Sequence, residues 1–438
     1  MVEAARRALS DGELRVGRIA LPWQSLAQAL AVCAVLAGIG FAEGGLLPRT
    51  WRLATIALLG LACAALVARP RLTVRRLDTA VLGAFTALVG WTALSAAWST
   101  LPTASLLQAE RVLVYAAALV AFLLLVEETA LPAVLAGALG GITLLAGYGL
   151  ARYVVAPPPL DVYEGRLLYQ PFGYANALGI VTTIGIVLAV GLALRARAGA
   201  ARAALAPLAV LVPALYFTAS RGAWLALAVG LAVLLGVRGG TRAGLGALAV
   251  LVLAAAVAVA AAAARHDLTM DRFAGENRPH YWNVAVQDFE EHPWLGPGAG
   301  TYGDYWLHHR PVRTFTRTAH SLYLQSLAEL GPLGLALVVS ALGLPLVALR
   351  AGRRDPLVAA AAGAYAAYLV HTGVDWDWEL PAVTLTGLVC GAALLLARRD
   401  EAAAIPARVR TLLLVTALVL GAVEAVRLAT GPGTPFGV

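Results

Sequence analysis

Long apolar runs, each about as long as a helix needs to cross a bilayer, recur along the whole chain and constrain its fold more than any other feature. The 438 residues are 60% hydrophobic and 13% charged, with a mean hydropathy of +0.77. Soluble domains carry about twice that share of charge, and about 20 apolar residues suffice for one transmembrane helix. Backbone polar groups must be satisfied within lipid, so such spans are helical. The sequence therefore predicts an all-α polytopic membrane protein.

We expect about twelve or thirteen transmembrane helices, the lower number applying if the segment 203–237 enters the bilayer and returns. The expected spans are 21–41, 51–68, 78–98, 109–126, 131–155, 174–194, 203–219, 222–237, 243–264, 320–349, 356–374, 381–397 and 411–430. They divide the chain into an N-terminal segment (1–20), a first set of helices (21–264), a long loop (265–319), a second set of helices (320–430) and a short tail (431–438).

The distribution of arginine predicts the orientation of these spans. All basic residues are arginines, and most lie in loops that alternate with loops nearly free of charge. Because positively charged short loops stay on the cytoplasmic side, we expect a cytoplasmic N-terminus and an extracytoplasmic loop 265–319. The net charge of +8 is then a consequence of topology, and we expect no nucleic-acid partner. The three cysteines lie in apolar runs, which excludes a disulfide framework and a CxxC metal site.

The loop 265–319 is the exception to the charge pattern, because it is rich in arginine although it faces outward. A loop this long is usually functional or disordered, and its tryptophans and tyrosines argue against disorder. Its arginines are Arg265, Arg272, Arg278, Arg310, Arg313 and Arg317. We therefore expect a functional loop.

Three motifs in this loop have both a functional and an ordinary interpretation. RPHYW places Arg278 four residues before Trp282, so a helix would bring both to one face; the alternative is an interfacial Trp beside a snorkelling Arg. GPGAGTYG contains GxGxxG, but no strand precedes it, and we interpret it as a tight turn. His308 and His309 are adjacent and point in different directions, so we expect no metal site.

Two further motifs lie where other spans meet the outer face. FTASRGAWLALAVG places Arg221 between apolar runs, where a charge costs a few kcal/mol unless it is paired or faces a cavity. Arg221 is thus either an anion-binding residue or an ordinary turn residue that reaches lipid headgroups. YEGRLLYQPFGYANALGI contributes Arg166 and Asn176.

HTGVDWDWELP combines Asp375, Asp377 and Glu379 with two tryptophans at the outer end of a span. Tryptophan is common at a membrane interface, but three carboxylates are not. These carboxylates could bind a sugar or orient a base.

His320 precedes an apolar run in TRTAHSLYLQ, at the outer N-terminus of its span. The helix dipole there favours the neutral imidazole, which is a usable general base at neutral pH. The alternative is an ordinary polar residue at a helix entry.

All of these polar motifs lie on the same outer face, which indicates one site. At this point the sequence resembles the O-antigen ligase and O-antigen polymerase superfamily of membrane glycosyltransferases. The resemblance rests on SRGAWLAL (220–227), RPHYW followed by EHPWLGPGAG (278–300), AHSLYLQSLAELGPLG (319–334) and, more loosely, PFGYANALG (171–179).

The resemblance implies a GT-C-like membrane enzyme in the bacterial plasma membrane, with its active site outside the cell. It would transfer a glycan from an undecaprenyl-diphosphate-type lipid to an acceptor hydroxyl, with inversion and without a metal or other cofactor. By position, Arg221 and Arg278 match the family's diphosphate-binding arginines and His320 matches its base. Asp375 or Asp377 matches an acidic residue near the end of a late span.

The residue types suit these roles. Guanidinium groups bind a diphosphate in paired geometry and stabilise charge on the leaving oxygen. The aromatic loop offers flat faces to sugar rings. The residues expected to contact substrate are Arg166, Asn176, Arg317, Tyr281, Trp282, Asp375 and Asp377.

Two alternatives stay open. The acceptor is a lipid or protein anchor for a ligase and another lipid-linked glycan for a polymerase, and the sequence does not decide between them. A transporter of lipid-linked or anionic substrates would need charges near the bilayer midplane. The spans show few of these, although Glu424 and Arg427 could pair at i, i+3.

Overall fold

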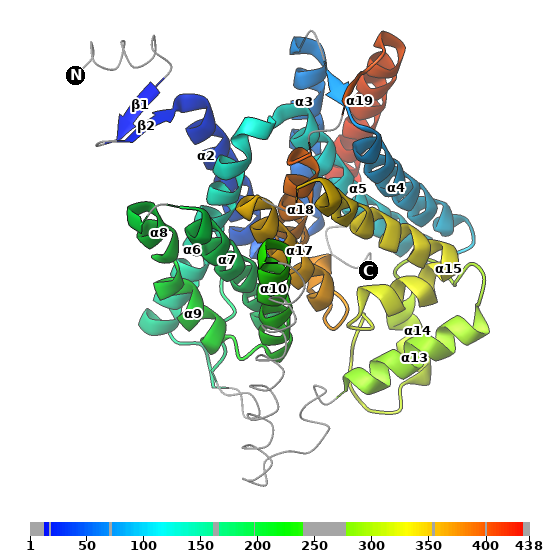
Figure 1. Cartoon of the computed structure of the whole chain (residues 1–438). Coiled ribbons are helices and arrows are strands. Elements are labelled where there is room, and N and C mark those ends of the chain that lie inside the picture. The colour runs from blue at the N-terminus through cyan, green and yellow to red at the C-terminus, as the bar shows by residue number, and fades with distance from the viewer. Residues whose placement is uncertain are drawn as a thin grey trace.

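The computed structural model describes residues 13–16, 19–69, 72–160, 166–196, 198–239, 277–352, 355–398 and 401–431. Within these residues the chain is almost entirely helical, which confirms the predicted all-α polytopic membrane protein (Figure 1). Ten helices are long and apolar enough to cross a membrane, and α17 and α18 are shorter apolar helices. Every expected span within the described residues coincides with helix. The expected span 243–264 lies outside them.

The first set of helices comprises α2 (Trp23–Phe41), α3 (Pro48–Ala68), α4 (Arg76–Leu94), α5 (Pro102–Leu125), α6 (Leu131–Val155), α7 (Ala175–Arg195), α8 (Ala198–Leu205), α9 (Leu208–Phe217) and α10 (Arg221–Gly239). The second comprises α13 (Arg278–Glu291), α14 (Tyr302–His309), α15 (Leu322–Gly343), α16 (Leu349–Gly352), α17 (Pro356–His371), α18 (Pro381–Leu396) and α19 (Ala407–Thr430).

Short elements join these helices. The 3-10 turns are η1 (Glu43–Gly45), η2 (Ser95–Ala97), η3 (Glu128–Ala130), η4 (Leu344–Ala348) and η5 (Asp377–Glu379). Strands β1 (Glu13–Val16) and β2 (Ile19–Pro22) form an antiparallel hairpin, and β3 (Thr73–Val74) pairs with β4 (Ala403–Ala404).

The helix starts follow from local sequence. Proline occupies the first turn of α3, α5, α13, α17 and α18, where its missing N–H costs no hydrogen bond. Asp355 caps α17 by accepting the Leu357 N–H at 2.9 Å. Ser321 caps α15 in the same way through the Leu324 N–H, at 3.4 Å. The Ser321 cap thus sets the start of α15 at Leu322, two residues after His320.

Helices α7 and α10 pack closely against α17. A Cβ on Gly363 of α17 would lie 2.4 Å from the Gly230 carbonyl of α10, and a Cβ on Gly191 of α7 would lie 2.2 Å from the Ala360 Cβ. Only glycine permits such backbone contact, which is how small residues bring membrane helices together. Helix α10 is therefore held firmly against α17.

The described part of the outer loop, α13 and α14, lies at the opposite end of the bundle from the β1–β2 hairpin (Figure 1). Tyr281 of α13 packs edge-on against Trp306 of α14, with ring centroids 4.9 Å apart. The Tyr302 hydroxyl donates to the Tyr281 carbonyl at 2.9 Å. These contacts make α13 and α14 one packed unit, which we call the outer unit (residues 277–321).

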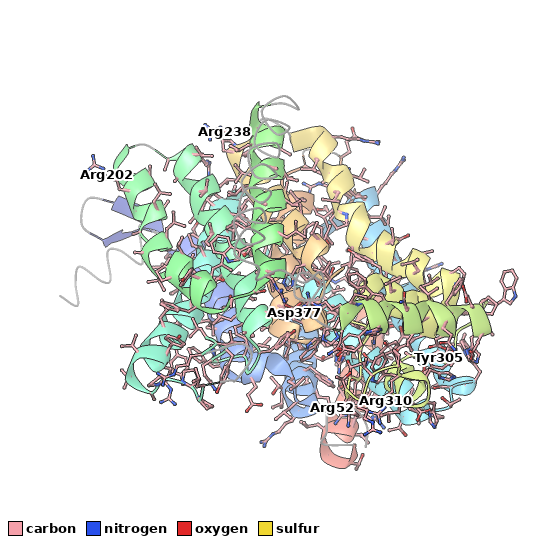
Figure 2. All side chains as sticks on the ribbon, turned by 90° about the horizontal axis from the view of Figure 1, so that it is seen from below. Arg52, Arg202, Arg238, Tyr305, Arg310 and Asp377 are labelled. Carbon is pink, nitrogen blue, oxygen red and sulfur yellow. The ribbon has the colours of Figure 1, made fainter. Side chains whose placement is uncertain are left out.

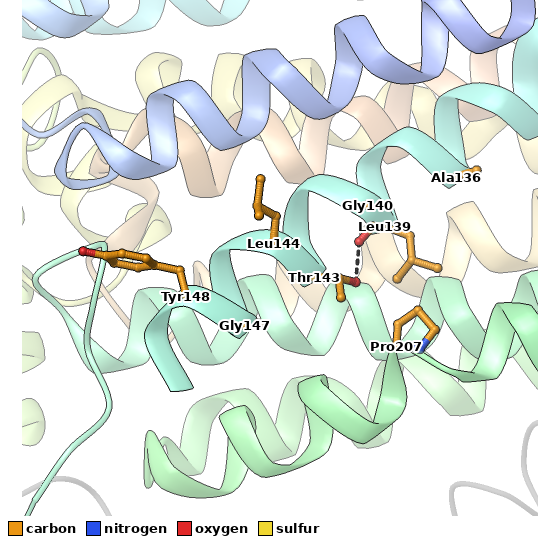
Figure 3. A pocket seen from close by; sticks show the side chains of 8 residues that line it. All are labelled: Ala136, Leu139, Gly140, Thr143, Leu144, Gly147, Tyr148 and Pro207. Atoms are coloured by element: carbon orange, nitrogen blue, oxygen red, sulfur yellow. Dashed lines mark hydrogen bonds between the residues drawn. The ribbon is translucent and has the colours of Figure 1, made fainter. Parts of the chain in front are cut away.

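A groove of about 450 Å³ lies on α6, closed on one side by Pro207 (Figure 3). Its lining is Ala136, Leu139, Gly140, Thr143, Leu144, Gly147, Tyr148 and Pro207. The Thr143 hydroxyl donates to the Leu139 carbonyl of its own helix at 2.7 Å. This groove offers no charged group to a phosphate, so the polar site must be sought elsewhere.

Candidate functional site

Asp375, in the connection between α17 and α18, is the centre of a polar cluster. It is 1% exposed, and its Oδ2 accepts hydrogen bonds from Arg278 Nη2 at 2.5 Å and from Asn176 Nδ2 at 2.7 Å. Its Oδ1 accepts from the Tyr174 hydroxyl at 2.8 Å. We call Tyr174, Asn176, Arg278, His320 and Asp375 the Asp375 cluster.

The N-termini of α7, α10, α13 and α15 converge on this cluster. Asn176 lies in the first turn of α7 and Arg278 begins α13. The Leu322 N–H, at the start of α15, donates to the Thr372 carbonyl at 2.8 Å. A Cβ on Gly222, in the first turn of α10, would lie 3.5 Å from Val374 Cγ2. Because helix N-termini carry partial positive charge, this arrangement favours an anion.

Arg221 is the first residue of α10, and its neighbour Gly222 contacts the residues just before Asp375. The Arg221 side chain is exposed. Ala219, two residues earlier, has a φ of +52°, in the left-handed region that is uncommon for residues other than glycine. The expected diphosphate-binding arginines, Arg221 and Arg278, thus come from two helix starts at the same end of the bundle.

His320 is held in an unusual backbone conformation with a defined ring orientation. Its φ is +51°, a conformation that costs about 1–3 kcal/mol and persists only where the surroundings enforce it. Its Nδ1 lies 3.3 Å from the Thr318 carbonyl oxygen, which can only accept a hydrogen bond. Nδ1 also lies 3.2 Å from the Thr318 hydroxyl, which can donate or accept. A general base at Nε2 requires the tautomer in which Nδ1 donates to Thr318.

The environment of His320 favours the neutral ring. Burial lowers its pKa below the usual value; Arg278 acts in the same direction, whereas Asp375 opposes them. The Tyr281 ring packs over the imidazole with centroids 4.9 Å apart. A neutral imidazole at neutral pH is the state that sequence analysis expected for a base.

Each of the three carboxylates in DWDWE has its own basic partner from a different element. Asp375 bonds to Arg278 of α13, Asp377 lies 3.2 Å from His371 Nδ1 of α17, and Glu379 lies 2.8 Å from Arg111 Nη1 of α5. Asp377 and Glu379 are 0% and 1% exposed. These two carboxylates hold the connection in place in this structure and do not face outward. Figure 2 shows Asp377 near the middle of the bundle.

His371 links the acidic connection to α10. Both His371 and Asp377 are 0% exposed. Nδ1 of His371 faces Asp377, and a Cβ on Gly222 would lie 3.1 Å from Nε2, the other ring nitrogen. The imidazole therefore sits directly against the first turn of α10, next to Arg221.

Glu329 of α15 fastens the GPGAG turn to the membrane domain. It is 4% exposed, and its carboxylate accepts the N–H groups of Gly300 at 2.9 Å and Tyr302 at 3.0 Å. Gly298 and Gly300 have φ of +110° and +79°, so they adopt the conformation that the expected tight turn requires. This turn carries the outer unit on α15, close to His320.

The other expected substrate-binding residues are Arg166, Arg317, Tyr281 and Trp282. Arg166 is exposed, and its carbonyl accepts from the Tyr153 hydroxyl at 3.1 Å. Arg317 lies over the Phe315 ring at 5.4 Å, within the outer unit. Tyr281 is 8% exposed and supports His320, while Trp282 is half-buried on α13.

Sequence reasoning missed Tyr174, His371, Arg111 and Glu329. Tyr174 and His371 lie within motifs that were singled out, two and four residues from expected site positions. Arg111 and Glu329 lie inside apolar spans, where an ionisable residue is itself a signal of function or of an ion pair. The sequence therefore marks Arg111 and Glu329 as unusual, but it does not show which residues they contact.

The Asp375 cluster combines helix N-termini, the partly exposed Arg278 guanidinium and an imidazole whose neutral form is favoured, at one end of a polytopic bundle. This chemistry suits transfer of a group from an anionic leaving group to a hydroxyl. The family model described as O-Antigen ligase matches residues 206–339, a segment that includes Arg221, Arg278 and His320. The match confirms the resemblance to the O-antigen ligase and polymerase superfamily, and supports a glycosyltransferase of ligase or polymerase type in general. No curated protein matches the chain.

Proposed function

We propose that this protein moves a glycan from an undecaprenyl-diphosphate-type lipid to an acceptor hydroxyl on the extracytoplasmic face of the bacterial plasma membrane. The observation that carries the proposal is the convergence of four helix N-termini on Arg278, Asp375 and His320. The arginine distribution favours a cytoplasmic N-terminus, which puts the cluster outside.

Arg221 and Arg278 bind the lipid diphosphate in this proposal. A guanidinium has five N–H donors, so Asp375 can hold one edge of Arg278 while other donors face the ligand. Arg278 is 19% exposed, in keeping with such a role. As the bond between sugar and phosphate breaks, negative charge grows on the leaving oxygen and the fixed guanidinium groups stabilise it. The arginines supply this charge stabilisation without a metal.

His320 activates the acceptor. Its Nε2 takes the proton of the acceptor hydroxyl as that oxygen attacks the anomeric carbon, and the lipid diphosphate departs with the electron pair. Attack from the side opposite the leaving group inverts the anomeric configuration. Asp375 orients Arg278, and Tyr281 and Thr318 orient the imidazole.

Transfer by purified protein in nanodiscs, in the presence of EDTA, tests the proposal. A lipid-diphosphate glycan is supplied as donor, with candidate acceptors, to wild type and His320→Ala. We expect a loss of about 10²–10⁴-fold in kcat for the variant, the contribution of a general base. A single addition to a lipid or protein identifies a ligase, which we favour, and a ladder identifies a polymerase. Activity retained by His320→Ala removes His320 as the base.

The same preparation separates this enzyme from a transporter. Movement of the lipid-linked substrate across a liposome membrane, with no transfer from any donor, would overturn the proposal. Dependence of transfer on a divalent cation, after EDTA treatment and readdition, would overturn the metal-independent part alone.

A further inference from the structure

Trp294 and Leu295 stand out among the residues of the outer unit, because they expose apolar side chains on a turn that is rigidly held. Trp294 is 81% exposed and Leu295 is 47% exposed. They follow α13 in the sequence HPWLGP. A large exposed apolar pair at the end of a polar helix needs a partner.

The backbone of this turn packs directly against α15. A Cβ on Gly331 would lie 2.2 Å from the Trp294 carbonyl oxygen and 3.2 Å from the Leu295 nitrogen. A Cβ on Gly296 would lie 2.2 Å from the Glu329 carbonyl. The Gly298 N–H donates to that same carbonyl at 3.0 Å. The turn therefore cannot move away from α15 without losing these contacts.

Helix α15 is kinked at Gly331, the residue that contacts the backbone of this turn. Gly331 has φ +68° and ψ −172°, and Pro332 follows it, so two helical segments meet here. The segment from Pro332 to the end of η4 at Ala348 spans about 25 Å as helix, close to the thickness of the hydrocarbon layer. The turn thus contacts α15 where the helix enters the hydrocarbon.

Two tryptophans of the membrane domain lie at the same level. Trp91, near the end of α4, donates its indole N–H to the Leu330 carbonyl at 3.1 Å. Trp98 donates to the Gly296 carbonyl at 3.2 Å. Tryptophans with an apolar ring and a bonded N–H gather at membrane interfaces. Trp98 bonds to the turn that carries Trp294, and Trp91 bonds to the residue of α15 just before the kink. The three indoles therefore belong to one interfacial belt.

We propose that Trp294 and Leu295 insert into the outer-leaflet boundary between headgroups and acyl chains and anchor the outer unit to the lipid. The partner is the bilayer itself. The exposed Leu333, on α15 just beyond the kink, continues the apolar surface into the hydrocarbon. This anchor fixes the height of α13 above the membrane, whatever reaction the cluster performs.

Depth-dependent quenching tests the anchor. Single cysteines at 294 and 295, in a background with Cys33, Cys63 and Cys390 replaced by alanine, are labelled with bimane in nanodiscs. Phe315, 62% exposed in the outer unit, is the aqueous control, and Val339, 52% exposed on α15, is the lipid control. We expect quenching at 294 and 295 by lipids with a shallow nitroxide, and iodide quenching at least threefold weaker than at 315.

A second measurement of the same anchor uses intrinsic tryptophan fluorescence and needs no labelled cysteine variant. Brominated lipids quench the intrinsic tryptophan fluorescence of wild type, and we expect the quenched fraction to fall in Trp294→Phe. The inference is overturned if positions 294 and 295 are quenched by iodide as strongly as 315 and not by lipid. It is also overturned if the brominated-lipid quenching of Trp294→Phe equals that of wild type.

Discussion

Two arginine–carboxylate pairs lie only four residues apart in the connection between α17 and α18, and they differ in exposure. Asp375 and Glu379 are each 1% exposed and each bonded to an arginine, at 2.5 Å and 2.8 Å. However, Arg278 is 19% exposed, whereas Arg111 is 1% exposed. Both pairs are arginine–carboxylate ion pairs, but only Arg278 is exposed enough to contact a ligand. Arg111 is buried within the helix bundle.

The surroundings of the two pairs sharpen this difference. Asp375 also accepts from Tyr174 and Asn176, so it keeps partners if Arg278 changes. Arg111 is buried, lies 4.9 Å from the centroid of the Trp51 ring and also donates to Gln108 Oε1 at 3.1 Å. A buried charge that loses its partner there is left uncompensated. We expect changes at Arg111 to act on stability and changes at Arg278 to act on activity.

Arg111→Gln should have the largest effect on stability. Breaking a buried ion pair costs about 3–5 kcal/mol, because Glu379 is left without its partner. The melting temperature in nanodiscs measures this loss. The double variant Arg111→Leu with Glu379→Leu should recover most of it, because no charge then stays buried. A single variant as stable as wild type would contradict the assigned role.

Arg278→Gln is the matched change at the more exposed pair. Glutamine can still donate to Asp375, so we expect a small shift in melting temperature. Loss of one preorganised group that stabilises the leaving oxygen should lower kcat/KM by about 10²–10³-fold. Transfer kinetics in nanodiscs measure this. If Arg278→Gln lowers the melting temperature as much as Arg111→Gln does, and its folded fraction keeps wild-type activity, then the two arginines do not differ in role.

Gly222→Ala tests the contact between α10 and His371. Its Cβ would lie 3.1 Å from His371 Nε2, which is tight enough to displace the start of α10 and Arg221. Overpacking of this kind costs about 1–3 kcal/mol, and we expect KM for the donor to rise more than kcat falls. A second change, His371→Ala, makes room and should restore part of the KM. An equal KM defect with and without His371 would rule out this contact as the cause.

The smallest expected effect is on the pH profile. Because burial lowers the pKa of His320, activity should be kept as pH falls to the usual histidine range and be lost only below it. Asp375 raises that pKa, so Asp375→Asn should move the acid limb to lower pH. The pH dependence of kcat/KM for wild type and variant measures the shift. An acid limb that moves to higher pH in Asp375→Asn would contradict the assignment of His320 as the base.

Much of the fold was predictable from sequence, because lipid leaves an apolar segment few choices besides helix. The predicted spans 222–237 and 320–349 begin within two residues of α10 and α15, and the predicted turn at 296–300 has left-handed glycines. The sequence predicts His320, Arg278 and Asn176 as site residues, but it does not predict the residues that they contact. The sequence also predicts Arg221 at the same end of the helix bundle as these residues.

The pairing of charges was not predictable, because spacing along one helix says nothing of partners on another. The i, i+3 spacing of Glu424 and Arg427 allows them to pair, but the structure bonds Arg427 Nε to Glu110 Oε1 of α5 at 2.5 Å. Arg52 of α3 reaches the same carboxylate, at 2.8 Å. Likewise, DWDWE read alone gave three equivalent carboxylates. Only packing divides them among α13, α17 and α5.

The most direct test of the account is equilibrium binding of undecaprenyl diphosphate to the protein in nanodiscs, with undecaprenyl monophosphate as the reference ligand. We predict that wild type prefers the diphosphate, that Arg278→Gln weakens its binding at least tenfold, and that the double leucine variant at 111 and 379 binds as wild type does. Equal binding by wild type and Arg278→Gln would contradict the claim that the Asp375 cluster holds the diphosphate.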